Sequence, residues 1–140
     1  MANMNQKLKA ELAPGIKAVL KKYGMKGSIA VRNHMVLVVN IKSGKLDVMD
    51  NWYNAVTKNG VFTVNSYGDN IKKPEYLDVN QYWIDDQYTG IVKQFINELY
   101  DAMKGDKWFD KSDIQSDYFH TAYYMDVNVG DYNKPYQFEG

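Results

Sequence analysis

The sequence holds only two histidines, and they limit the acid–base or metal chemistry that the chain could perform. His34 lies between two apolar runs, where a hairpin turn is expected, and His120 lies in a stretch that alternates apolar and polar residues. Histidine titrates near neutral pH, so either side chain could transfer a proton or bind a metal. A metal site would need two or three carboxylate partners, which the spacing does not supply. We expect His34 to be a turn residue and His120 to lie on a solvated sheet face, with anion binding or proton transfer by His120 as the alternative.

The most unusual segment runs from Gly105 to Asp117 and carries several aspartates among lysines and serines. Such carboxylates could hold calcium or magnesium, but their spacing differs from that of an EF-hand loop. We therefore expect them to cap turns and helices. Trp108 and Phe109 lie in the middle of the segment and are expected to anchor it to the core. If they are exposed instead, they become candidates for contact with a partner protein.

No catalytic motif accompanies these residues. The sequence lacks a Walker loop, a glycine-rich dinucleotide turn, a nucleophile elbow and the His-Glu helix of zinc proteases. It contains no cysteine, which excludes disulfides, thiolate catalysis and cysteine-based zinc sites. The sequence thus assigns no catalytic residue, no metal site and no cofactor. A binding protein is favoured over an enzyme, and a hydrolase that uses His120 with Asp117 or Asp126 remains the competing hypothesis.

The charge balance argues against a general affinity for nucleic acid. The chain has 17 basic and 17 acidic residues, and Arg32 is its single arginine. A balanced chain has no overall field to attract a polyanion, and the readers of phosphate and guanine are usually arginines. A local site remains possible, because Arg32 and nearby lysines could form a basic edge beside a hairpin. Exposed Tyr118 and Tyr124 would then stack on bases, which makes a nucleic-acid-associated module the alternative function.

The elements that must position these side chains follow from apolar periodicity. Helices are expected over 4–23, with a kink or break at Pro14-Gly15, over 50–56 with Asp50 as its cap, and over 85–104 with Asp85 or Asp86 as its cap. Strands are expected over 28–32 and 35–41, joined by Asn33-His34, and over 118–129. Weaker patterns favour a strand at 61–64, a strand or extended lead-in at 79–83, and an extended tail at 132–136.

These elements indicate one α+β domain that spans residues 1–140. Too few helices and strands alternate for a parallel doubly wound sheet, so we expect a small antiparallel sheet of three to five strands with two main helices packed on one face. The strand 35–39 is apolar at nearly every position and should be central and covered on both faces. In strand 118–129 the odd-numbered residues should face the helices. The even-numbered ones, including Tyr118, His120 and Tyr124, should be partly exposed.

No secretory signal and no apolar run of membrane-spanning length is present, so the expected location is the cytoplasm, with no membrane partner. Twelve tyrosines and three tryptophans raise the aromatic content to 14%, and the tyrosines gather in the second half. Tyrosine suits half-buried sheet faces and binding surfaces alike. Sheet packing is the first interpretation of this enrichment, and a binding surface is the second.

Two stretches carry a resemblance to known proteins. Residues 13–44, from Ala13-Pro14-Gly15 through the hairpin to Ser43-Gly44, resemble the start of small uncharacterised accessory proteins of tailed phages. Residues 110–136 resemble the end of the same group and are similar to a large-polyvalent-protein-associated domain of phage and plasmid proteins. The resemblance implies no enzymatic activity and supplies no catalytic residues. It implies a phage-encoded protein in the bacterial host cytoplasm that engages a host, defence or phage protein or associates with itself.

Overall fold

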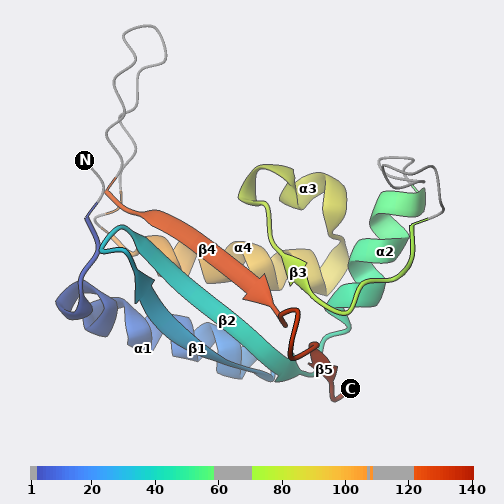
Figure 1. Ribbon diagram of the computed structural model, residues 1–140, viewed down its shortest axis with the longest axis horizontal. Coiled ribbons are helices and arrows are strands. Elements are labelled where there is room, and N and C mark those ends of the chain that lie inside the picture. The colour runs from blue at the N-terminus through green and yellow to red at the C-terminus, as the bar shows by residue number, and fades with distance from the viewer. Residues whose placement is uncertain (1–2, 59–70, 107, 109–121) are drawn as a thin grey trace, which may run out of the picture.

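A mixed β-sheet forms the centre of the computed structural model, which describes residues 3–58, 71–106, 108 and 122–140 (Figure 1). The architecture is α+β. In chain order the elements are α1 (Gln6–Lys22), β1 (Met25–Arg32), β2 (Val36–Gly44), α2 (Val48–Lys58), β3 (Leu77–Asp78), the 3₁₀ turn η1 (Gln81–Trp83), α3 (Ile84–Gln87), α4 (Gly90–Lys104), β4 (Tyr124–Val129) and β5 (Gln137–Phe138).

The strands lie in the order β1-β2-β4-β3, and β5 pairs with the end of β2. The pairs β1–β2 and β3–β4 are antiparallel, whereas β2–β4 and β2–β5 are parallel. The expected number of strands and the α+β class are confirmed, but the expectation of a wholly antiparallel sheet is wrong. The reason is that α2, α3 and α4 lie between β2 and β4 in the chain. They form a helical crossover, and a crossover allows the chain to re-enter the sheet in the original direction.

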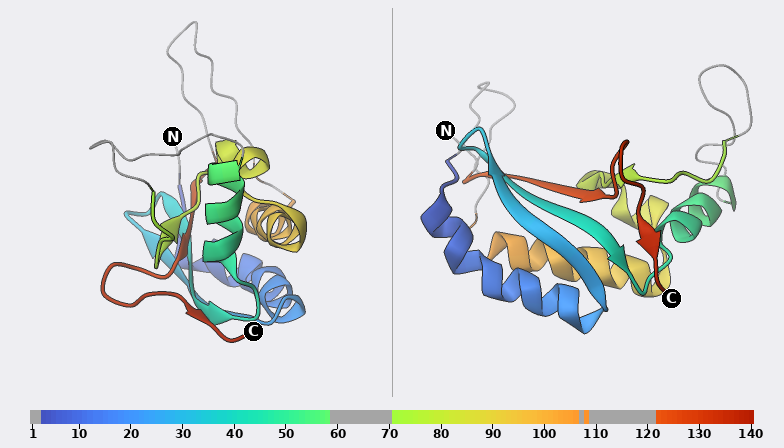
Figure 2. Two further views of the ribbon diagram at one scale, coloured as in Figure 1. Left: turned by 90° about the vertical axis from the view of Figure 1, so that its right-hand side faces the viewer. Right: turned by 60° about the horizontal axis from the view of Figure 1, so that its bottom comes forward.

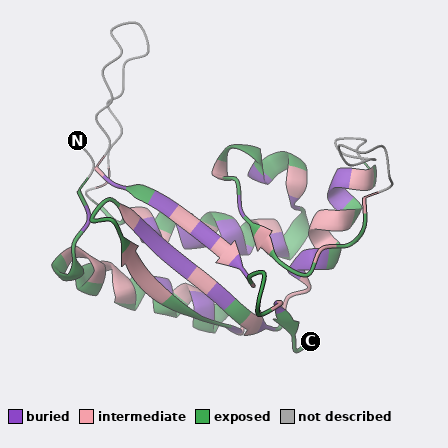
Figure 3. Ribbon diagram, viewed as in Figure 1, coloured by how far each residue is buried: buried purple, intermediate pink, exposed green. Residues whose placement is uncertain are grey.

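Helices α1 and α4 pack side by side against one face of the sheet, as expected (Figure 2). Along β2 and β4 every second residue points into this layer and is buried: Leu37, Val39, Ile41, Met125, Val127 and Val129. They meet the apolar stripes of the helices, which include Ile16, Leu20, Phe95, Ile96 and Leu99. The alternation along β4 is visible as stripes in Figure 3, whereas residues 37–39 of β2 form one buried block because Val38 is buried as well. The expected inward set of strand 118–129 is therefore confirmed from Tyr123 to Val129, and residues 118–121 lie outside the described residues.

Helix α1 is a single helix through Pro14, so of the two alternatives expected there, a kink or a break, the break is wrong. The side chain of Asn5 caps its first turn by accepting a hydrogen bond from Leu8 N at 2.8 Å. At the other end Gly24 has a φ of +68°, the left-handed conformation that ends helices and favours glycine. The chain then turns directly into β1.

The helix expected over 85–104 is two helices, α3 and α4. Asn51 of α2 explains the division, because its side-chain amide binds the backbone of Thr89 in both directions. Asn51 Nδ2 donates to Thr89 O at 3.1 Å, and Asn51 Oδ1 accepts from Thr89 N at 3.0 Å. Gly90 follows with a φ of +56°. The cap of α4 is thus Thr89, and not Asp85 or Asp86 as expected.

Of the other local expectations, the hairpin turn is confirmed and two others are wrong. Asn33 and His34 both have positive φ, and Met35 N bonds to Arg32 O at 3.1 Å, as a tight hairpin turn requires. Helix α2 begins earlier than expected, and Asp47 rather than Asp50 accepts the capping bond. Of residues 79–83, the last three form the 3₁₀ turn η1, and no strand runs through this segment. The strand expected at 61–64 lies outside the described residues.

None of the described helices is long and apolar enough to cross a membrane.

Candidate functional site

The face of the sheet opposite α1 and α4 is covered by none of the described helices (Figure 2). We call it the open face, and it consists of the alternate residues of three neighbouring strands. The register places them in three rows: Arg32, Val36 and Tyr124; Ala30, Val38 and Asp126; and Ser28, Asn40 and Asn128. Strand β3 extends the third row with Asp78.

An ion pair crosses the centre of the open face. Arg32 Nη2 lies 2.7 Å from Asp126 Oδ2, so the pair reaches from β1 over β2 to β4. Both side chains remain solvated, with 52% and 34% of their surfaces exposed. Val38 is the neighbour of Asp126 in the register, and the ion pair explains why this valine is only 5% exposed on a face that no described helix covers. The expectation that β2 is central and covered on both faces therefore holds at Val38, where side chains do the covering.

A polar hollow of about 360 Å³ opens beside this ion pair. In its floor Asn128 Nδ2 donates to Asn40 Oδ1 at 3.1 Å. Its lining is Arg32, Asn40, Tyr76, Asp78, Asp126, Asn128, Gly130, Asp131 and Tyr132. Three carboxylates face one guanidinium there, so the hollow is acidic on balance. Asp126 also affects a tyrosine in the core. The pKa of the Tyr100 hydroxyl is raised, first by burial and then by the negative charge of Asp126.

Exposed tyrosines lie around the open face. Tyr76 is 43% exposed, Tyr124 50% and Tyr132 81%, and large aromatic side chains with this much free surface are common at protein contacts. Beyond Tyr124 a second hollow, of about 300 Å³, is lined by residues that include Tyr82, Trp108 and Tyr124. The open face therefore combines a polar centre with an aromatic margin.

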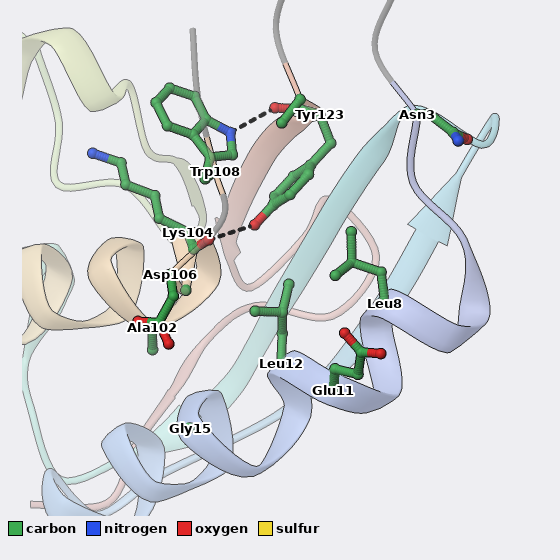
Figure 4. A pocket seen from close by; sticks show the side chains of 12 residues that line it. Asn3, Leu8, Glu11, Leu12, Gly15, Ala102, Lys104, Asp106, Trp108 and Tyr123 are labelled. Carbon is green, nitrogen blue, oxygen red and sulfur yellow. Dashed lines mark hydrogen bonds between the residues drawn. The ribbon is translucent and has the colours of Figure 1, made fainter.

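Trp108 separates this second hollow from a larger apolar groove of about 640 Å³ between α1 and α4. Leu8 and Leu12 point into the groove toward Tyr123 (Figure 4). Trp108 Nε1 donates to Tyr123 O at 2.9 Å, and Lys104 Nζ lies 5.3 Å from the centre of the indole ring. Trp108 thus packs against the core, as expected of an anchor. Trp108 and Ala122, which flank residues 109–121 in the sequence, line this groove, whereas the open face is formed entirely by described residues and is therefore the candidate site.

Tyr123 fixes the start of β4 to the end of α4. Its hydroxyl donates to Met103 O at 2.5 Å and approaches Lys104 O at 2.9 Å, two carbonyls of the last helical turn. Burial raises the pKa of this hydroxyl to about 12. The contact sets where β4 begins, and it thereby places Tyr124 and Asp126 on the open face.

The residues singled out from the sequence are only partly brought together. Arg32 and Tyr124 share one row of the open face, and Trp108 and Tyr124 share the second hollow. His34 lies in the hairpin turn, where its carbonyl accepts a bond from Met4 N. Phe109, Tyr118 and His120 lie outside the described residues. Among the described residues no three His, Asp or Glu side chains form a group that could hold a metal ion.

Four residues of the open face were not predicted from the sequence as site residues: Asn40, Asn128, Tyr76 and Tyr132. A signal for Asn40 was present, because it is a polar residue within the apolar run that forms β2. Tyr76 and Tyr132 lie in irregular segments, where periodicity carries no information about which face a side chain joins.

Comparison of the chain with protein-family models, with curated proteins and with solved structures finds no match.

Proposed function

We propose that this chain is a non-enzymatic binding module that engages a partner protein through the open face of its sheet. The observation that carries the proposal is the combination of a sheet face that none of the described helices covers with exposed Tyr76, Tyr124 and Tyr132 at its margin. Tyrosine brings a large apolar surface at a small cost in side-chain entropy, and it is enriched where proteins meet. The resemblance of residues 13–44 and 110–136 adds the proposal that the protein is a phage-encoded accessory factor with a host, defence or phage protein as its partner.

The charges of the open face favour a protein over nucleic acid as the partner. The one arginine of the face already pairs with Asp126, and Asp78 and Asp131 line the same hollow. A nucleic-acid strand placed there would bring its phosphates close to these carboxylates. Like charges at short range disfavour such a contact. The polar centre instead suits a partner surface that carries both hydrogen-bond donors and apolar groups.

The proposal is tested by quantitative capture of proteins from a bacterial lysate with the tagged full chain, with and without nuclease. Tyr124→Ala and Tyr132→Ala should each reduce capture of the partner by about tenfold, the size of effect expected when an aromatic hot-spot side chain is removed. Ile91→Ser is the matched control, because Ile91 is 58% exposed on α4, which packs against the opposite face. Its capture should equal that of the unaltered chain.

The possible results separate the proposal from its competitors. A captured protein that survives nuclease and depends on the two tyrosines supports the proposal and identifies the partner. Capture that nuclease abolishes would favour the nucleic-acid-associated module. If the captured protein is the chain itself, the open face mediates self-association. Equal losses from the tyrosine variants and from Ile91→Ser would contradict the assignment of the open face.

A further inference from the structure

A second surface, separate from the open face, gathers four lysines where α1, β1 and the end of β2 meet. Lys17 and Lys21 of α1, Lys26 of β1 and Lys45 line a hollow of about 700 Å³, which we call the lysine corner. Its remaining lining is Leu20, Gly24, Met25, Gly27 and Glu139. The floor is therefore apolar, and the margin is positively charged.

Glycines allow the lysine corner to form. A Cβ at Gly24 would lie 2.5 Å from Lys45 Cγ, so the stem of Lys45 can cross the turn after α1 only because that position is a glycine. A Cβ at Gly27 would lie 2.4 Å from the carbonyl oxygen of Asn40, at the point where the register of β1 shifts. The two glycines bring the lysines of three elements around one hollow.

The lysine corner has an excess of positive charge. Four lysines and one glutamate leave three positive charges uncompensated within the lining. Lys26 Nζ lies 3.4 Å from Glu139 Oε1, whereas Lys17, Lys21 and Lys45 form no ion pair with any carboxylate of the described residues. Such a surface attracts an anionic ligand more strongly than its surroundings do.

The chain itself shows which kind of anion fits there. The tail pairs with Ser43 and Gly44 as strand β5, and Glu139 N donates to Gly44 O at 2.7 Å. An extended segment of this protein thus already places one carboxylate, that of Glu139, at the margin of the hollow. The described lining contains neither an arginine nor an aromatic side chain, the groups that usually hold phosphates in bidentate fashion and stack on bases.

We propose that the lysine corner is a docking site for an acidic, extended peptide segment of a partner protein, and that Glu139 competes with that segment for Lys26. The site is distinct from the open face and does not depend on the function proposed for it. The lysines supply the charge complementarity, and the apolar floor accepts side chains between the carboxylates. Because the lysines are exposed, binding should weaken as ionic strength rises.

The probe is a hexaglutamate peptide, titrated into the full chain at about 0.15 M salt, where the screening length is about 8 Å, while backbone amide signals are followed by NMR. Binding should shift the amide signals of Gly24, Lys26 and Lys45, with a Kd below about 1 mM. Lys17→Glu should weaken the affinity about tenfold, through one lost attraction and one new repulsion. Lys7→Glu is the matched control, because it makes the same charge change on the same helix about 15 Å from Lys17. This distance is greater than the screening length at physiological salt.

A second pair of variants tests the role of the tail. Glu139→Gln removes the competing carboxylate and should raise the affinity for hexaglutamate about threefold. Glu75→Gln produces the same net charge elsewhere on the surface and should change the affinity by less than about twofold. Tyr124→Ala, on the open face, should leave hexaglutamate binding unchanged, which separates this site from the one proposed above.

Four results would overturn the proposal. They are the absence of any shift at the lysine corner, equal losses from Lys17→Glu and Lys7→Glu, equal gains from Glu139→Gln and Glu75→Gln, and tighter binding of a thymidine oligonucleotide of equal charge. The last result would assign the corner to nucleic acid.

Discussion

The ion pair between Arg32 and Asp126 offers the sharpest test of whether the central part of the sheet is an exposed surface. The perturbation is a double-mutant cycle made of Arg32→Gln, Asp126→Asn and the two together. Arg32 Nη2 and Asp126 Oδ2 are 2.7 Å apart, but 52% and 34% of the two side chains are exposed, so water screens their attraction. Two charges about 4 Å apart in a water-like dielectric attract by about 1 kcal/mol, and measured exposed pairs give about 0.2–1 kcal/mol. We expect a coupling free energy of about 0.5–1 kcal/mol.

The assay is urea unfolding of the four chains, followed by far-ultraviolet circular dichroism at low and at high salt. The coupling should fall by about half or more at 1 M salt, where the screening length is about 3 Å. A coupling above about 3 kcal/mol that salt does not change would show that the pair is desolvated. The face would then be covered, and the reasoning from an open face would be refuted. A coupling below about 0.2 kcal/mol would contradict the expected attraction between the two side chains.

Three further predictions concern the stability of the elements that carry the open face and the lysine corner. Tyr123→Phe should lower the free energy of unfolding by about 1–3 kcal/mol, because two carbonyls at the end of α4 lose their donor, whereas Tyr124→Phe should change it by less than about 0.5 kcal/mol in the same urea assay. Burial raises the pKa of Tyr123 from 10 to about 12, so the stability that this group contributes is complete below pH 10 and is lost as the pH rises toward 12. Unfolding midpoints measured between pH 9 and 12 should therefore fall, and an equally steep fall in Tyr123→Phe would contradict the assignment to this residue. Gly27→Ala should destabilise the protein by about 2 kcal/mol or more because its Cβ would meet a backbone oxygen at 2.4 Å, and Gly90→Ala, with open space around it, should cost only about 1 kcal/mol in thermal unfolding.

Much of the fold could be predicted from the sequence because strong periodicity reflects burial. The stripes of α1 and α4 and the alternation around Met125 and Val127 each follow from one buried face. The positive φ at Asn33 and His34 followed from the residues that tolerate a tight hairpin turn. Signals of this kind are local, and they are reliable where one side of an element meets the core.

The parts that failed depend on contacts between distant residues. The division between α3 and α4 rests on Asn51, which lies 38 positions before Thr89 and binds its backbone. The parallel pairing of β2 with β4 depends on how the intervening helices return the chain, which no local pattern encodes. Arg32 and Tyr124 could be chosen from the sequence as exposed residues, but only the register places them in one row. The lysine corner could not be predicted for the same reason, because its four lysines come from three segments.

Hydroxyl-radical footprinting of the chain, alone and in the complex captured from lysate, tests the central claim most directly. Tyr76, Tyr124 and Tyr132 should be oxidised readily in the free chain and protected in the complex, while Ile91 on α4 should be oxidised equally in both. Protection of Ile91 with continued oxidation of the three tyrosines would place the partner on the opposite side of the molecule and would contradict the account.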